Sequence, residues 1–170
     1  MLLDFERSSC SCKKCRDACI RSPSYLIPQD MKPYMKETGF NIEETSSEEE
    51  IINWGKQSVL SSIFTFTLRN ERLPVLIPKS DAKGVCVHFR NERCEVHSNS
   101  PYGCRMFSCK DSHEETIRRE DFGIKTLLPL IACAKGEIPS ELLTESERIY
   151  FLLLENCRLR TWVKDEIGTS

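Results

Sequence analysis

Hydrophobic and polar residues recur with two different periods along this chain, and the change of period divides it into three regions. In the first region, the apolar residues of segment 27–40 follow helical spacing and end at Gly39, which suits a helix C-terminus. A second short helix is expected to begin at Ser47, because Glu50 three residues later completes the pattern of a capping box.

Residues 62–97 change to a period of two. Four short runs in this region are rich in β-branched and aromatic residues, and turn-forming segments separate them. The runs are SIFTFTLR, RLPVLIPK, VCVHF and RCEVH. They predict a small antiparallel sheet, followed by a loop over residues 98–113 with at most one helical turn.

The last third of the chain returns to helical periodicity. Segment 122–137 is expected to form a helix that is broken or kinked at Pro129 and stops near Gly136. Thr144 and Glu147 predict a further capping box. The segment after Thr144 keeps one hydrophobic face and is expected to be the longest helix, with Ile149, Leu152, Leu153, Asn156, Leu159 and Val163 on that face.

Together these elements predict an α+β fold, in which a small cysteine-rich core with short antiparallel strands is flanked by helices. The length of 170 residues fits one domain of ordinary size. We therefore expect a single domain over residues 1–170, with a core over 10–110 and a helical part over 114–167 packed on it.

Composition and charge narrow the choice of partners and compartment. Charged residues make up 29% of the chain, but the net charge is −2, so no general attraction to nucleic acid or anionic lipid is indicated. No stretch approaches the roughly 20 apolar residues that cross a bilayer, and the first residues do not resemble a secretory signal. We expect a cytoplasmic protein with reduced thiols that does not bind a membrane. A protein partner is possible, and binding to nucleic acid is not favoured by the net charge.

Eight of the ten cysteines fall into two groups, Cys10, Cys12, Cys15 and Cys19, then Cys86, Cys94, Cys104 and Cys109. Ten cysteines is about 6% of the chain, below the roughly 8–10% of small disulfide scaffolds. In a reducing compartment, clustered cysteines favour metal ligation over disulfides. Cys133 and Cys157 instead lie within apolar helical patterns and are predicted to be core residues.

The spacing of the cysteines predicts that both groups share one metal region. Cys12 and Cys15 form a short CxxC segment that lets two thiolates reach one ion. Since one loop cannot close such a site alone, the hairpin carrying Cys86 and Cys94 and the following loop with Cys104 are expected to complete it. The basic residues beside the cysteines would balance the thiolate charge; they are Lys13, Lys14, Arg16, Arg21, Arg90, Arg93, Arg105 and Lys110.

These motifs resemble those of the YkgJ-type CxxCxxCC cysteine-cluster family, whose members are described as zinc- or iron-chelating domains. The first block, CKKCRDAC, is similar to the family's opening motif, although one Cys19 stands where the family has paired cysteines. The second match is more specific and runs from Cys86 through VHFRNER to Cys94, EVHSNSPYG, Cys104 and RMF. Cys10 and Cys109 have no counterpart in the family pattern. The resemblance implies a metal or cluster site, and some relatives are linked to iron–sulfur-dependent protein lysine methylation.

The cysteines fit either of two cofactors, because Zn²⁺ and a [4Fe–4S] cluster both accept four thiolates. The tight spacing of the first group and the basic flanks slightly favour the cluster. We expect a cysteine-cluster metalloprotein with a redox or cluster-dependent protein-modification role. The alternative is a zinc-stapled binding module for a protein or nucleic-acid partner.

The chain offers no further candidate for catalysis. It contains no Gly-x-Ser-x-Gly, His-Glu-x-x-His or phosphate-binding glycine loop. His88, His97 and His113 are predicted to play polar or supporting roles beside the cysteines rather than to bind the metal directly. Catalytic residues stay unknown, and the sequence leaves open whether the protein is an enzyme.

Overall fold

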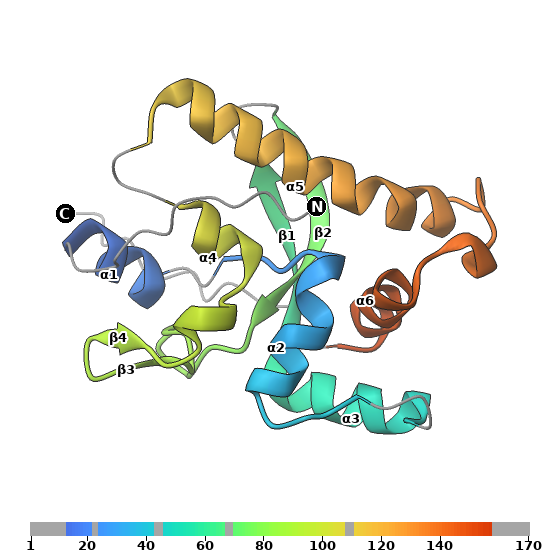
Figure 1. Cartoon of the computed structure of the whole chain (residues 1–170), viewed down its shortest axis with the longest axis horizontal. Helices are drawn as coiled ribbons and strands as arrows, with labels where there is room; N and C mark the ends of the chain where they lie inside the picture. Colours follow the sequence, from blue (N-terminus) through green and yellow to red (C-terminus); the bar gives the residue numbers. More distant parts are fainter. Residues whose placement is uncertain (1–12, 22–23, 43–45, 67–69, 108–110, 158–170) are drawn as a thin grey trace, which may run out of the picture.

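The computed structural model describes residues 13–21, 24–42, 46–66, 70–107 and 111–157. It confirms the α+β class, with helices around small antiparallel sheets and a helical C-terminal part (Figure 1). The β1–β2 hairpin lies at the centre, the long helix α5 crosses it, and α1, α4 and the β3–β4 hairpin lie on one side (Figure 1). None of the described helices is both long and apolar enough to cross a membrane.

Three helices precede the strands: α1 (Lys13–Arg21), α2 (Met31–Glu37) and α3 (Glu48–Ser58). A 3₁₀ turn, Pro28–Asp30, leads directly into α2. Just after α2, Gly39 takes a left-handed φ of 86°, as its predicted place after a helix requires. The predicted capping box also forms, since Ser47 and Glu50 exchange backbone-to-side-chain hydrogen bonds at the start of α3.

The strands form two separate pairs, where the sequence predicted a single small sheet. Strand β1 (Val59–Phe66) pairs with β2 (Glu71–Pro78), and β3 (Phe89–Arg90) pairs with β4 (Arg93–Cys94), both antiparallel. Most of the run VCVHF is not a strand. Phe89 N–H donates to Cys86 O at 3.0 Å and closes a turn there, leaving Cys86 only an isolated bridge to Ser80.

The C-terminal part contains α4 (Tyr102–Met106), α5 (His113–Ala134) and α6 (Glu145–Asn156), with 3₁₀ turns at His97–Asn99 and Ser140–Leu142. Two predictions are confirmed: the capping box of Thr144 and Glu147, and the helix end near Gly136. Residues 98–113 contain more helix than the single turn expected, because the five-residue α4 follows a 3₁₀ turn. Leu159 and Val163 lie outside the described residues.

Helix α5 corrects two predictions. It is not broken at Pro129 but continues through it, and with 22 residues it is longer than α6 with 12. It also begins earlier than predicted, because Ser112 and Glu115 form a capping box that we had not identified. Leu127 and Leu130 on either side of the proline are buried, and this packing offsets the one hydrogen bond that proline removes.

The core joins α6 to the hairpin and to the segment that follows α1. Tyr150 of α6 is fully buried, and its hydroxyl donates to Leu26 O and accepts from Leu76 N–H, both at 2.8 Å. Helices α3 and α6 approach closely at Gly55, where an added Cβ would lie 2.2 Å from Cδ2 of Leu153. This core fixes the segment around Leu26, which leads from the first cysteine group into α2.

Candidate metal centre

The structure describes the side chains of four of the eight predicted ligands. Cys19 lies in α1, Cys86 in the turn before β3, Cys94 at the end of β4, and Cys104 in α4. Cys10, Cys12 and Cys109 lie outside the described residues, and only the backbone of Cys15 is described. The six described cysteines, which include Cys133 and Cys157, are all in the reduced form.

The first cysteine group does not lie wholly in a loop, as the sequence analysis assumed. From Lys13 onward the backbone is helical, which places the positions of Cys15 and Cys19 one turn apart along α1. A helix can present two such positions toward a common neighbour as well as a loop can. The sequence signal that could have shown this is the spacing of four, which is the i, i+4 spacing of a helix.

The charges of described cysteines from both groups act on Cys104. Burial raises the pKa of the Cys104 thiol well above its ordinary value, and Cys19, Cys86 and Cys94 raise it further through their charges. Cys19 belongs to the first group, so residues far apart in the sequence lie within electrostatic reach of one another. The fully buried Tyr34 borders the same region, because Cys86, Cys104 and Cys94 add to the effect of burial in raising its pKa.

Backbone N–H groups point at two of these sulfurs. The N–H groups of His88 and Phe89 lower the pKa of the Cys86 thiol against the larger effect of burial. The N–H of Ser24 likewise lowers the pKa of the Cys104 thiol against the larger effect of burial. Such donors stabilise the thiolate form, which is the form that binds zinc or iron.

The β3–β4 hairpin also contacts α1 directly. Its turn residues Asn91 and Glu92 have φ of 49° and 61°, the left-handed pair of a tight hairpin turn. Glu92 accepts a hydrogen bond from Arg16 of α1, with 3.0 Å between Nη1 and Oε2. This exposed ion pair joins the first cysteine group to the hairpin that carries the second.

Three of the basic residues beside the cysteines pair with carboxylates, and their role in balancing the charge of metal-bound thiolates stays a prediction. Arg16 pairs with Glu92, Arg90 with Glu95, and Arg105 with Asp30. Burial raises the pKa of the Cys104 thiol well above its ordinary value and so disfavours its charged form. The guanidinium groups therefore find stronger partners in the neighbouring acids.

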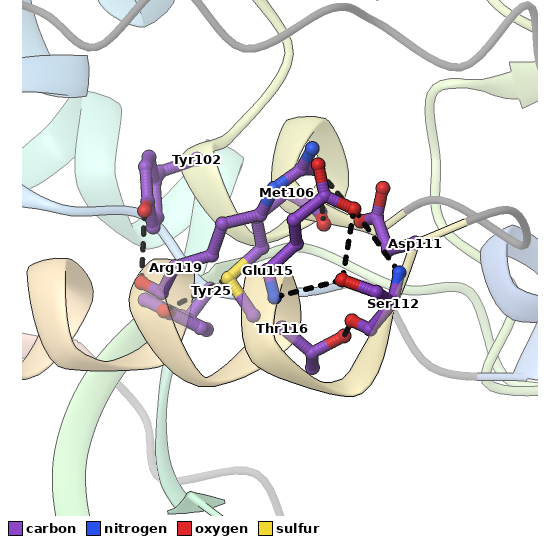
Figure 2. A network of polar contacts seen from close by, with 8 residues as sticks. All are labelled: Tyr25, Tyr102, Met106, Asp111, Ser112, Glu115, Thr116 and Arg119. Carbon is purple, nitrogen blue, oxygen red and sulfur yellow. Dashed lines mark hydrogen bonds and ion pairs between the residues drawn. The ribbon is translucent and has the colours of Figure 1, made fainter.

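Helix α4 also contacts α5, through hydrogen bonds between residues of the two helices (Figure 2). Arg119 pairs with Asp111 at 2.8 Å and donates to Met106 O at 2.8 Å, while its own carbonyl accepts from the Tyr102 hydroxyl at 2.9 Å. Tyr25 donates to Sδ of Met106 at 3.3 Å (Figure 2). Sequence reasoning missed Arg119, because an arginine within a charged helical stretch carries no signal of burial.

His88, Cys133 and Cys157 keep to the roles predicted for them. Nε2 of His88 forms a hydrogen bond with the Tyr34 hydroxyl at 2.7 Å, which is a supporting contact beside Cys86. Cys157 is buried, which raises the pKa of its thiol to about 11, and Cys133 packs against the core. Both behave as small hydrophobic residues.

The donor set suits zinc or an iron–sulfur centre, since it consists of thiols with backbone N–H donors at the sulfur. Across the described ranges, however, no three His, Cys, Asp or Glu side chains are arranged closely enough to hold a metal ion. The four described thiols therefore approach each other without completing a coordination sphere among themselves. The full set of eight ligands stays a prediction.

Comparison with known families identifies a metal-chelating type of domain. A family model described as "Putative zinc- or iron-chelating domain" matches residues 11–123. The matched range begins directly after Cys10 and contains the seven other clustered cysteines. No curated protein and no solved structure matches the chain.

Proposed function

The chain belongs to the CxxCxxCC family of zinc- or iron-chelating domains, and from this premise we propose that its two distant cysteine groups bind one shared metal centre. The observation that supports a shared centre is the electrostatic contact of Cys104 with Cys19, Cys86 and Cys94. Two separate sites, each formed within one group, would not require Cys19 to lie close to Cys104.

We assign the ligands in two tiers. The first tier would hold the metal and consists of Cys12, Cys15, Cys19, Cys86, Cys94 and Cys104. Cys10 and Cys109 form the second tier, because the family pattern has no counterpart for them. Their thiols are candidates for a second metal ion or for exchange with a partner protein.

We favour an iron–sulfur cluster over zinc, and with it a redox or cluster-dependent modification role. A cluster here would supply one-electron transfer. The residues of this chain would bind it through thiolates, stabilise the sulfurs through the N–H groups of Ser24, His88 and Phe89, and exclude water with the buried Tyr34. Hydrogen bonds to sulfur raise the reduction potential of such clusters.

Anaerobic purification followed by metal analysis and a visible spectrum distinguishes the two cofactors. Stoichiometric iron and sulfide with a brown, reducible absorption band is expected for the cluster. A colourless protein with stoichiometric zinc would reject the cluster and leave the zinc centre.

Cysteine variants test whether the site is shared. Cys15→Ser and Cys94→Ser remove one predicted ligand from each group, so each should lose the metal and lower the stability, since metal affinity is folding free energy at such sites. Cys133→Ser is the matched control and should keep the metal, because Cys133 packs against the core. Unchanged metal content in both ligand variants would reject a shared centre.

A zinc-stapled binding module is the second candidate, and exposed cations beside the site favour it. Lys13 and Lys14 of α1 and Arg93 of the hairpin are exposed, on elements that the Arg16–Glu92 pair joins. Salt-dependent binding of RNA or DNA by a colourless zinc form would support this function. Reversible reduction of a bound cluster would support the first.

A further inference from the structure

A buried carboxylate outside the cysteine groups contacts the helix that carries Cys104. Asp30, the last residue of the 3₁₀ turn before α2, is only 1% exposed. A buried charge is costly unless it is paired and hydrogen-bonded. Its Oδ2 accepts from the N–H groups of Ile27, at 3.0 Å, and Tyr102, at 2.6 Å, and its Oδ1 pairs with the guanidinium of Arg105.

Two of these three partners belong to α4 and lie on either side of Cys104. Tyr102 is the first residue of that five-residue helix and Arg105 is the fourth. One contact fixes the position of the helix N-terminus, and the other restricts rotation of the helix about its axis. A helix this short cannot hold its own orientation, so external contacts determine where its thiol lies.

The segment leading from the first cysteine group meets α4 at the same place. The N–H of Gly103 donates to Tyr25 O at 2.9 Å, and the N–H of Ser24 donates to the sulfur of Cys104. Ser24 and Tyr25 both belong to the segment that connects α1, which carries Cys19, to Asp30. The Asp30 contacts therefore lock α4 onto the chain segment that follows the first cysteine group.

We propose that Asp30 is a positioning residue of the metal centre, whose carboxylate sets α4 against residues 24–27 and so places the Cys104 thiol opposite the first cysteine group. This inference rests on the proposed function, since it assigns Cys104 as a ligand. It goes further because Asp30 has no thiol and lies outside both cysteine groups. We infer that Asp30 nevertheless controls where the Cys104 thiol lies relative to the first group. Buried ion pairs often add little to stability, and specifying one arrangement is the best attested use of such pairs.

Asp30 could instead contribute only to general stability, and a matched variant separates the two roles. The Tyr150 hydroxyl bonds to Leu26 O and Leu76 N–H, so Tyr150→Phe loosens the same segment from the side opposite α4. Asp30→Asn keeps the size of the side chain but removes the charge that holds Arg105. Arg105→Lys keeps the charge and leaves both N–H bonds to Asp30, and serves as the milder variant if Asp30→Asn fails to fold.

The experiment measures zinc affinity by competition with a chelator, together with the alkylation rate of Cys104 in the metal-free protein. Mass spectrometry assigns alkylation to each cysteine, and Cys133 is the internal reference. Asp30→Asn is expected to weaken zinc binding roughly 10–100-fold, as loss of a supporting contact around a ligand does, and to accelerate alkylation of Cys104 relative to Cys133. Arg105→Lys should also weaken zinc binding and accelerate alkylation of Cys104, but by smaller factors than Asp30→Asn.

The outcomes separate this inference from the proposed function. Equal loss of zinc affinity in Asp30→Asn and Tyr150→Phe, at equal loss of thermal stability, would overturn the positioning role. If the unaltered protein binds no metal, the proposed function fails, yet Cys104 alkylation still tests the placement. In that case, a Cys104 alkylation rate that is unchanged in both Asp30→Asn and Arg105→Lys would also overturn the positioning role of Asp30.

Discussion

Two regions of this molecule are held together by different means. The hydrophobic region, formed by α2, α3, the β1–β2 hairpin and α6, buries complete side chains such as Val59, Phe66 and Leu153. The cysteine region, formed by α1, the β3–β4 hairpin and α4, consists of short elements, with strands of two residues and a helix of five. Its elements are joined by ion pairs such as Arg16–Glu92 and Asp30–Arg105, and Tyr102 of α4 anchors it in the hydrophobic core.

The difference teaches which region needs a cofactor. A two-stranded hairpin without a buried face is at best marginally stable in water, and an exposed ion pair adds little. The hydrophobic region can fold by burying apolar surface. The cysteine region is therefore where a bound metal would contribute most to the order of the chain.

The largest expected effect is that of metal removal, and it should be confined to one region. A strong chelator should raise amide hydrogen exchange in β3, β4 and α4, while β1, β2 and α6 keep their protection, because only the first set depends on the thiolates for cross-linking. Hydrogen exchange with mass spectrometry measures both regions in one sample. Simultaneous loss of protection in both would contradict the division into two regions.

Leu153→Ala tests the opposite region. The fully buried Leu153 lies where α6 packs against α3, so its truncation should lower the free energy of unfolding by about 2–5 kcal/mol. Chemical denaturation measures the loss. Metal stoichiometry below the transition should stay at that of the unaltered protein, since none of the described ligands lies in α3 or α6.

A pair of glycine substitutions applies the same chemical change to each region. At Gly103 an added Cβ would lie 2.1 Å from Oγ of Ser24, and at Gly55 it would lie 2.2 Å from Cδ2 of Leu153. Each alanine variant should cost about 1–3 kcal/mol through overpacking, as measured by chemical denaturation. Only Gly103→Ala should also weaken zinc binding, because it pushes α4 away from the N–H donor of Cys104. Equal zinc affinity in the two variants would refute this.

The smallest effect concerns two exposed capping boxes and should not distinguish the regions. Hydrogen bonds from Ser112 to Glu115, and from Ser47 to Glu50, lower the pKa of each carboxyl below its ordinary 4.5. A lowered folded-state pKa gives stability that is present above pH 4.5 and is lost as the pH falls below it. Glu115→Gln and Glu50→Gln should each slightly flatten the acid side of the stability curve, measured by denaturation from about pH 6 to about pH 3.

The sequence predicted best those features that depend on neighbouring residues. The capping boxes at Ser47 and Thr144 and the helix end near Gly136 follow from local hydrogen bonding and backbone freedom, and all three are confirmed. Pro129 misled the prediction because packing of α5 outweighs the local preference of proline. The run VCVHF misleads because valine and phenylalanine favour strands, whereas the chain turns here, with Phe89 N–H bonded to Cys86 O.

In the candidate site too, features that depend on local sequence could be predicted, and those that depend on long-range contacts could not. Grouping the cysteines required only their spacing, and the shared site stays a prediction. Asp30 and Arg119 could not be found from sequence, because each is charged and lies in a polar stretch, and only the folded chain brings it to α4. Long-range polar contacts leave no periodic signal.

The β1–β2 hairpin has a consequence for how the site is assembled. Residues 20–85 separate Cys19 from Cys86, and α2, α3 and the hairpin occupy that stretch. In an unfolded chain, bringing these two thiols together would carry the entropy cost of closing that whole loop. Folding of the hydrophobic region meets that cost beforehand, so Cys19 and Cys86 are held at a high effective concentration before any ligand bond forms. The hydrophobic core thus acts as a tether whose folding sets the apparent affinity of the predicted site, which it borders at Tyr34.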